Sequence, residues 1–178
     1  MNKDARKRLG QILLIVGRIA LASIFIIAGY AKVKPLPGMA WSLASIKTSL
    51  LMFAIQVDSY QMLPPWTANA LGHLLPLFEL FLGLWLLTGI ALRYSSLIAT
   101  LAFCGFMAAI ASAYHRGLAI DCGCGIGPLE QVGPAALIRD GLKFLPLALA
   151  VTIGAFWIHR KPRAASLPEA TPSTQHAE

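Results

Sequence analysis

Long apolar runs separated by short polar segments dominate this chain. Four of these runs are long enough to cross a hydrocarbon core of about 30 Å, which takes roughly 20 helical residues. They cover residues 10–33, 68–92, 95–114 and 134–159. We expect each run to span a membrane as a helix. The short connections between them predict an all-α fold, an antiparallel four-helix transmembrane bundle.

The segment between the first two runs, residues 35–66, is too polar and too rich in proline to span a membrane cleanly. Its apolar side chains recur at spacings of three and four, which predicts an amphipathic helix. The expected apolar stripe consists of Leu43, Ile46, Leu50, Phe53 and Val57, and the residues expected off it are Ser42, Ser45, Ser49 and Gln56. We expect this helix to lie on the membrane or to pack over the bundle. A covering loop without chemistry of its own is the alternative.

Composition supports a membrane protein, whose first partner is the lipid bilayer. Of the 178 residues, 57% are hydrophobic and 13% are charged, whereas soluble domains carry about 25% charged residues. The net charge of +7 does not indicate a nucleic-acid partner, because the basic residues gather at the ends of the apolar runs and in the tails.

The same basic residues predict the orientation, because cytoplasmic flanks are enriched in Lys and Arg. Those expected in the cytoplasm are Lys3, Arg6, Lys7, Arg8, Arg93, Arg160, Lys161 and Arg163. Both termini are then cytoplasmic in a multi-pass protein. We expect a short N-terminus over residues 1–9, one membrane domain over residues 10–160, and a disordered cytoplasmic tail over residues 161–178, which is poor in apolar residues.

Cys122 and Cys124, separated by one glycine, form the most distinctive motif of the chain. The predicted topology puts them on the outer side of the membrane, where thiols can be oxidised. Their spacing keeps the sulfurs within reach of each other, and strained or exposed disulfides tend to be the catalytic ones. We therefore expect a redox-active disulfide and name both cysteines as candidate catalytic residues. A structural staple or two unremarkable thiols are the alternatives.

Charged residues near this pair suggest how its chemistry is tuned. A cation such as Arg116 or protonated His115 stabilises a thiolate, whereas Asp121 opposes it. Arg139 and Asp140, at the mouth of the fourth run, are expected to complete this rim. In a second interpretation the two cysteines bind Cu(I) or zinc as soft ligands, with His115 or Asp121 as a third.

Ionisable residues inside the apolar runs need a partner or a cavity. Arg18 and Glu79 can form an ion pair, or Arg18 can snorkel to the cytoplasmic surface. Glu79 is a candidate for lining a quinone or substrate pocket, with His73 as a more distant second residue, although structural roles remain open for both. Lys32, at the end of the first run, is assigned to the charged rim or to a structural role, and Cys104 is expected to be a small buried residue.

Four pieces of the chain, taken in their order and spacing, resemble the MauE branch of the MauE/DoxX family of redox-associated membrane proteins. These pieces are residues 17–32, 60–64, 76–89 and 116–125. The resemblance implies a small four-helix protein of the bacterial inner membrane that supports disulfide formation or maturation of exported proteins. The methylamine-utilisation member is thought to act in this way on the disulfide-rich subunit of methylamine dehydrogenase.

Thiol–disulfide exchange through Cys122 and Cys124 is therefore the expected activity. The resemblance implies an exported thioredoxin-like or disulfide-rich partner, and a quinone near Glu79 is a candidate for reoxidising the cysteines. A metal-handling protein and a non-catalytic membrane assembly subunit are the two alternatives.

Overall fold

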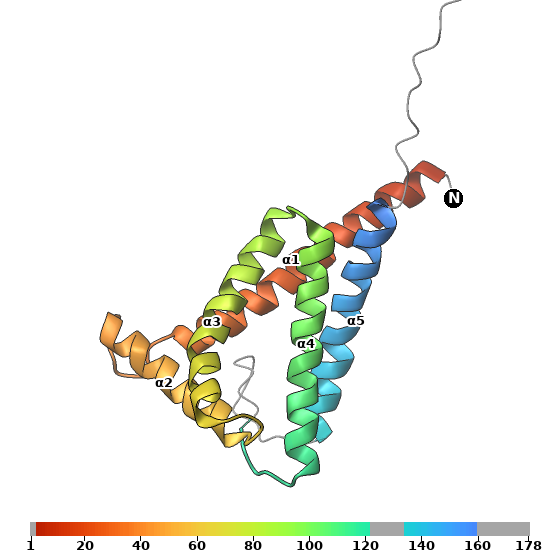
Figure 1. Ribbon diagram of the computed structural model, residues 1–178. Coiled ribbons are helices and arrows are strands. Elements are labelled where there is room, and N and C mark those ends of the chain that lie inside the picture. Colours follow the sequence, from red (N-terminus) through yellow and green to blue (C-terminus); the bar gives the residue numbers. More distant parts are fainter. Residues whose placement is uncertain (1–2, 122–133, 160–178) are drawn as a thin grey trace, which may run out of the picture.

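The computed structural model describes residues 3–121 and 134–159, which form five α-helices and no strand (Figure 1). The helices are α1 (Lys3–Val33), α2 (Leu43–Ser59), α3 (Pro65–Thr88), α4 (Leu92–His115) and α5 (Pro134–His159). The predicted all-α class is confirmed.

Three of these helices are long and apolar enough to cross a membrane. They supply the candidate spans Arg8–Val33, Pro65–Thr88 and Leu92–His115, which correspond to the first three predicted runs. Helix α5 has 26 residues, and its described apolar segment is Phe144–Trp157. Three predicted spans are thus supported by helix length and composition, while the fourth stays a prediction.

Helices α3 and α4 form a hairpin whose turn ends α3 earlier than the apolar pattern predicts. Gly89 caps α3 with φ 71°, and Ala91 begins the next helix with φ 49°. Gly89 readily adopts this left-handed conformation because it lacks a Cβ. From this turn the two helices diverge, and α5 runs beside α4 (Figure 1). A hydrogen bond between the hydroxyls of Thr100 and Thr152, 2.9 Å apart, joins α4 to α5.

Helices α1 and α3 cross at very short distance through glycines. A Cβ on Gly29 would lie 2.8 Å from Cγ of Leu80 and 2.9 Å from the carbonyl oxygen of Pro76. A Cβ on Gly83 would lie 3.0 Å from the carbonyl oxygen of Ala22. Small residues allow membrane helices to approach this closely. The crossing brings the C-terminal half of α1 against the middle of α3.

Helix α2 packs against α3 through a face that the sequence pattern predicts only in part, since Leu50 and Phe53 of the expected stripe are buried. Its buried residues are Ser45, Ser49, Leu50, Phe53 and Ala54. The expected apolar stripe is wrong at two points: Leu43 is 80% exposed, and two of the serines expected off the stripe are buried.

Backbone hydrogen bonds explain why serines can occupy this face. The hydroxyl of Ser45 donates to the carbonyl oxygen of Ala40 at 2.6 Å, and that of Ser49 donates to the carbonyl oxygen of Lys34 at 2.9 Å. Because each buried hydroxyl has an acceptor, little is lost by removing it from water. These bonds fasten α2 to the connection that leads out of α1.

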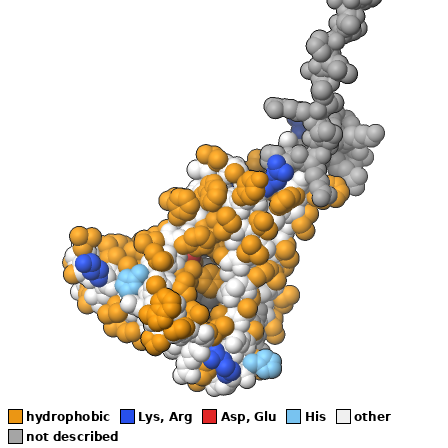
Figure 2. Space-filling model, in the orientation of Figure 1, with side chains coloured by type: hydrophobic (Ala, Val, Ile, Leu, Met, Phe, Trp, Pro, Cys, Tyr) orange, Lys and Arg blue, Asp and Glu red, His pale blue; other side chains and the backbone are white. Residues whose placement is uncertain are grey.

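Hydrophobic side chains cover most of the visible surface, as expected of a protein embedded in lipid (Figure 2). Trp66 near the start of α3 and Trp157 near the end of α5 are both 74% exposed, and exposed tryptophans favour the two membrane interfaces. The expectation that Cys104 is buried is wrong, since this free cysteine is exposed on α4. A thiol is apolar enough to face lipid tails, so the outer face of a membrane helix accepts it.

A candidate ligand pocket with a buried ion pair

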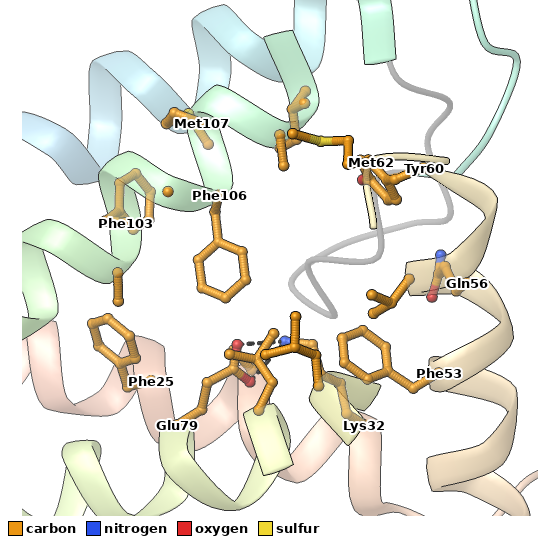
Figure 3. Close-up of a pocket in the computed structure, with 18 of the residues that line it drawn as sticks. Phe25, Lys32, Phe53, Gln56, Tyr60, Met62, Glu79, Phe103, Phe106 and Met107 are labelled. Atoms are coloured by element: carbon orange, nitrogen blue, oxygen red, sulfur yellow. Dashed lines mark hydrogen bonds and ion pairs between the residues drawn. The ribbon is translucent and has the colours of Figure 1, made fainter. Parts of the chain in front are cut away.

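A cavity of about 380 Å³ lies between α1, α2 and α3 on one side and α4 and α5 on the other (Figure 3). This volume falls in the range of about 300–1,000 Å³ that is typical of small-molecule sites. The walls are almost entirely apolar. The residues that carry its chemistry are Phe25, Lys32, Phe53, Gln56, Tyr60, Met62, Glu79, Phe103, Phe106 and Met107.

Lys32 of α1 and Glu79 of α3 form a buried ion pair in the wall of this cavity. The ammonium nitrogen Nζ of Lys32 donates to Oε1 of Glu79 at 2.8 Å and to Oε2 at 2.7 Å. The side chains of the lysine and the glutamate are 5% and 2% exposed. Each charge supplies the partner that the other needs in a low-dielectric interior. The pair as a whole is electrically neutral.

Two aromatic rings flank the lysine. Nζ of Lys32 lies 5.2 Å from the ring centre of Phe53 and 5.8 Å from that of Phe106, within the range of cation–π attraction. Phe106 projects from α4 towards the ion pair, across the cavity (Figure 3). The ammonium group is therefore held by one carboxylate and two rings, at the point where four helices face one cavity.

The end of α2 forms a polar edge of the cavity and holds the segment that follows α4. Nε2 of Gln56 donates to the carbonyl oxygen of Asp121 at 3.4 Å. Nη1 of Arg116 donates to the carbonyl oxygen of Gln61 at 3.1 Å, and its Nη2 donates to that of Tyr60. Gln56 and Tyr60 both line the cavity. The chain therefore passes beside this edge just before residue 122.

Tyr60 has an altered acidity at this edge. Burial raises the pKa of its phenol to about 12, and the negative charge of Asp121 contributes in the same direction. Both causes act against the phenolate, because a buried anion loses hydration and a neighbouring carboxylate repels it. Tyr60 is therefore neutral at physiological pH.

The predicted intramembrane residues are found at two different sites. Glu79 faces the cavity, but its partner is Lys32, so the alternative of an Arg18–Glu79 ion pair is wrong. Lys32 is buried in the cavity wall instead of lying at an outer rim. Arg18 lies against the C-terminal turn of α3, because a Cβ on Gly89 would come within 2.0 Å of its Nη1. A cation is favoured there by the carbonyl groups that end a helix.

Other predicted residues lie away from the ion pair or outside the described residues. His73 does not line the cavity, and its Nδ1 is 2.8 Å from the carbonyl oxygen of Asn69 on the same helix. His115, Arg116 and Asp121 are exposed at the end of α4 and just beyond it. Arg139 and Asp140 belong to the early turns of α5. Cys122 and Cys124 lie outside the described residues.

Within residues 3–121 and 134–159 there is no group of three or more His, Cys, Asp or Glu side chains placed to hold a metal ion. The interior role of Lys32 is the feature that sequence reasoning missed. One signal for it is present: Lys32 lies one helical turn beyond Gly29, a small residue at which another helix can approach closely. Because α1 and α3 are antiparallel, the contacts of Gly29 with Pro76 and Leu80 put Glu79 beside Gly29, and the long side chain of Lys32 spans the remaining turn.

Long apolar helices, outward-facing hydrophobic side chains and a charge pair confined to an interior cavity define a helical membrane protein. The sequence model of the family described as methylamine utilisation protein MauE matches residues 10–158. The chain belongs to this family. Comparisons with curated proteins and with solved structures find no match.

Proposed function

We propose that this protein carries out thiol–disulfide exchange at the outer face of the bacterial inner membrane, through Cys122 and Cys124. The observation that carries the proposal is the attachment of the preceding segment. Asp121 accepts a hydrogen bond from Gln56 in the last turn of α2, and Arg116 donates to the carbonyl oxygens of Tyr60 and Gln61, which follow that helix. A cysteine pair that directly follows such an anchor starts from a fixed point beside the membrane domain. The chain belongs to the family described as methylamine utilisation protein MauE, and the maturation role that the sequence resemblance implies supports the proposal.

The exchange step balances without a further reactant. A thiolate of an exported protein attacks one sulfur of the Cys122–Cys124 disulfide, and this forms a mixed disulfide and releases the other cysteine as a thiolate. The second thiolate of the partner then attacks the mixed disulfide. The partner leaves with a new disulfide, and Cys122 and Cys124 are left as two thiols. Two electrons and two protons have passed from the partner to this protein.

The proposed topology has both termini in the cytoplasm and four spanning helices, with α5 as the fourth. Close contacts put several basic residues at one end of the molecule. Arg18 lies beside Gly89 of the α3–α4 turn, and a Cβ on Gly17 would lie 3.0 Å from Val151 of α5. Arg93 lies over the ring of Phe156 near the end of α5. This end then faces the cytoplasm, and α2 and the cysteine pair belong to the opposite face.

Single cysteine variants test the exchange directly. Cys122→Ser or Cys124→Ser removes the thiol that resolves the intermediate, so we expect one of the two variants to accumulate a reductant-sensitive adduct with an exported protein. Cys104→Ser is the matched control and is expected to form none, since that residue lies on α4. Membranes should be isolated after acid quenching and analysed with and without reductant. If neither variant forms an adduct, exchange is excluded, and bound Cu(I) or zinc in the purified protein would then favour metal handling.

A further inference from the structure

We propose that the cavity beside Lys32 and Glu79 binds a lipid-soluble quinone, with one quinone carbonyl oxygen accepting a hydrogen bond from Nζ of Lys32. Electron transfer from the cysteine pair to this quinone rests on the proposed function. Binding itself rests on the cavity alone.

The donor count of the ion pair identifies the polar group of the ligand. A lysine ammonium carries three N–H donors and no acceptor. Two close contacts of Lys32 go to the two carboxylate oxygens of Glu79, which leaves one donor for a ligand in the cavity that both residues line. A carbonyl oxygen is a matching acceptor.

The charge of the site identifies the ligand as neutral. Glu79 repels an anion that Lys32 attracts, and the reverse holds for a cation, so the close pair favours neither sign of charge. The two charges already neutralise each other, so a ligand that brought a net charge would leave that charge unpaired in an apolar cavity.

The walls favour a flat ring. Phe53 and Phe106 lie on either side of the lysine nitrogen, and Phe25 and Phe103 line the same cavity. Aromatic side chains pack well against a second planar ring. Gln56, at the polar edge formed by α2, lies across the cavity from Glu79 (Figure 3). A para-quinone has its second carbonyl at the far end of the ring, where an amide donor is favourable.

The arrangement of the helices gives a route from the bilayer. Helices α3 and α4 diverge from their shared turn (Figure 1), and both supply residues that line the cavity. The molecular surface is hollowed there among hydrophobic side chains, and an acidic side chain is visible inside (Figure 2). In the proposal, the ligand enters from the bilayer on the side of α3 and α4, and its isoprenoid tail stays in lipid.

If Cys122 and Cys124 carry out the proposed exchange, the quinone can reoxidise them in a balanced step. The thiols of Cys122 and Cys124 give up two electrons and two protons and form their disulfide. The quinone takes up both electrons and both protons and leaves as the quinol.

The test measures binding of decylubiquinone to the purified full-length protein in nanodiscs. Quenching of tryptophan fluorescence is the readout. The decisive variant is Lys32→Met with Glu79→Gln, which removes both charges together so that neither is left unpaired. We expect its Kd to rise at least tenfold. Lys34→Met, at an exposed lysine two residues further along the chain, is the matched control and should bind like the original protein. Phe106→Leu should weaken binding severalfold through loss of the ring.

Unchanged affinity in the double variant would overturn the proposal, because an apolar compound that only fills space does not need Lys32. If the double variant does not fold, Phe106→Leu takes its place, and unchanged affinity in that variant overturns the proposal. A protein with Cys122→Ala and Cys124→Ala should bind decylubiquinone normally. If decylubiquinone binds normally and the single serine variants trap no adduct, the exchange function is rejected and the pocket is kept. A trapped adduct without binding would reject the pocket and keep the exchange function.

Discussion

Lys32 and Glu79, 47 residues apart in the sequence, are each other's buried counter-ion at the crossing of α1 and α3. Their meeting depends on the helix crossing one turn before Lys32, where Gly29 lies against the carbonyl oxygen of Pro76 and beside Leu80, the residue after Glu79. The pair thus couples helix packing to the chemistry of the cavity. Removing one charge and removing both should therefore have different consequences.

Lys32→Met alone should destabilise the protein by about 3–5 kcal/mol, since it leaves a buried carboxylate without its partner. Lys32→Met combined with Glu79→Gln should recover most of that loss. Unfolding in mixed detergent micelles, followed by circular dichroism, measures both. Lys34→Met should change the free energy of unfolding by less than about 0.5 kcal/mol, as is usual for surface substitutions. A double variant as unstable as the single one would show that the pair itself stabilises the fold.

Gly72 is the contact on which the docking of α2 depends. A Cβ there would lie 2.3 Å from Cα of Ala54, so Gly72→Ala must push two helix backbones apart. We expect a loss of about 1–3 kcal/mol, the usual cost of overpacking. Gly105→Ala is the matched control, because a Cβ at Gly105 would meet no atom of the described residues within 4 Å, and helix propensity predicts a gain of up to about 1 kcal/mol. Thermal unfolding of both variants in the same detergent makes the comparison.

The sequence predicts the helices well because apolar length alone decides whether a segment can cross lipid. It predicts the charge pair only in part. Glu79 lies in the middle of an apolar run, so an interior partner was expected, but Lys32 lies at the end of its run and resembles an interfacial lysine. The glycine crossing that brings the two side chains within reach is a tertiary contact. The prediction for Ser45 and Ser49 is wrong for a similar reason, since each hydroxyl also donates to a backbone carbonyl of a residue outside α2.

Tyr60 gives the protein a specific sensitivity to alkaline pH. Its pKa of about 12 in the folded protein exceeds the ordinary value of 10.0. The unfolded chain therefore loses this proton first as pH rises. Stability contributed by the neutral phenol is complete below about pH 10 and is lost between about pH 10 and 12.

Tyr60→Phe should remove the loss of stability between about pH 10 and 12. Asp121→Asn should lower the pKa of Tyr60, because it removes a repelling charge. Ultraviolet absorbance of tyrosinate during a pH titration measures the pKa, and unfolding at several pH values measures the stability. Tyr94→Phe, at a 64% exposed tyrosine, is the control and should leave the high-pKa component in place. If the high-pKa component disappears in Tyr94→Phe and persists in Tyr60→Phe, it belongs to Tyr94, and the prediction for Tyr60 is wrong.

The three cysteines give the sharpest test of orientation. In sealed spheroplasts, an impermeant maleimide should label Cys122 and Cys124 only after a reductant is added, because the proposed disulfide faces the exterior. Cys104 should resist this reagent in both conditions. It is exposed on α4, inside a candidate span, and a polar reagent that does not enter hydrocarbon cannot reach it there. A Cys104→Ser protein should give the same pattern for the pair. Labelling of Cys122 and Cys124 only after the membrane is permeabilised would place them in the cytoplasm, and the exchange proposal would lose its oxidising compartment.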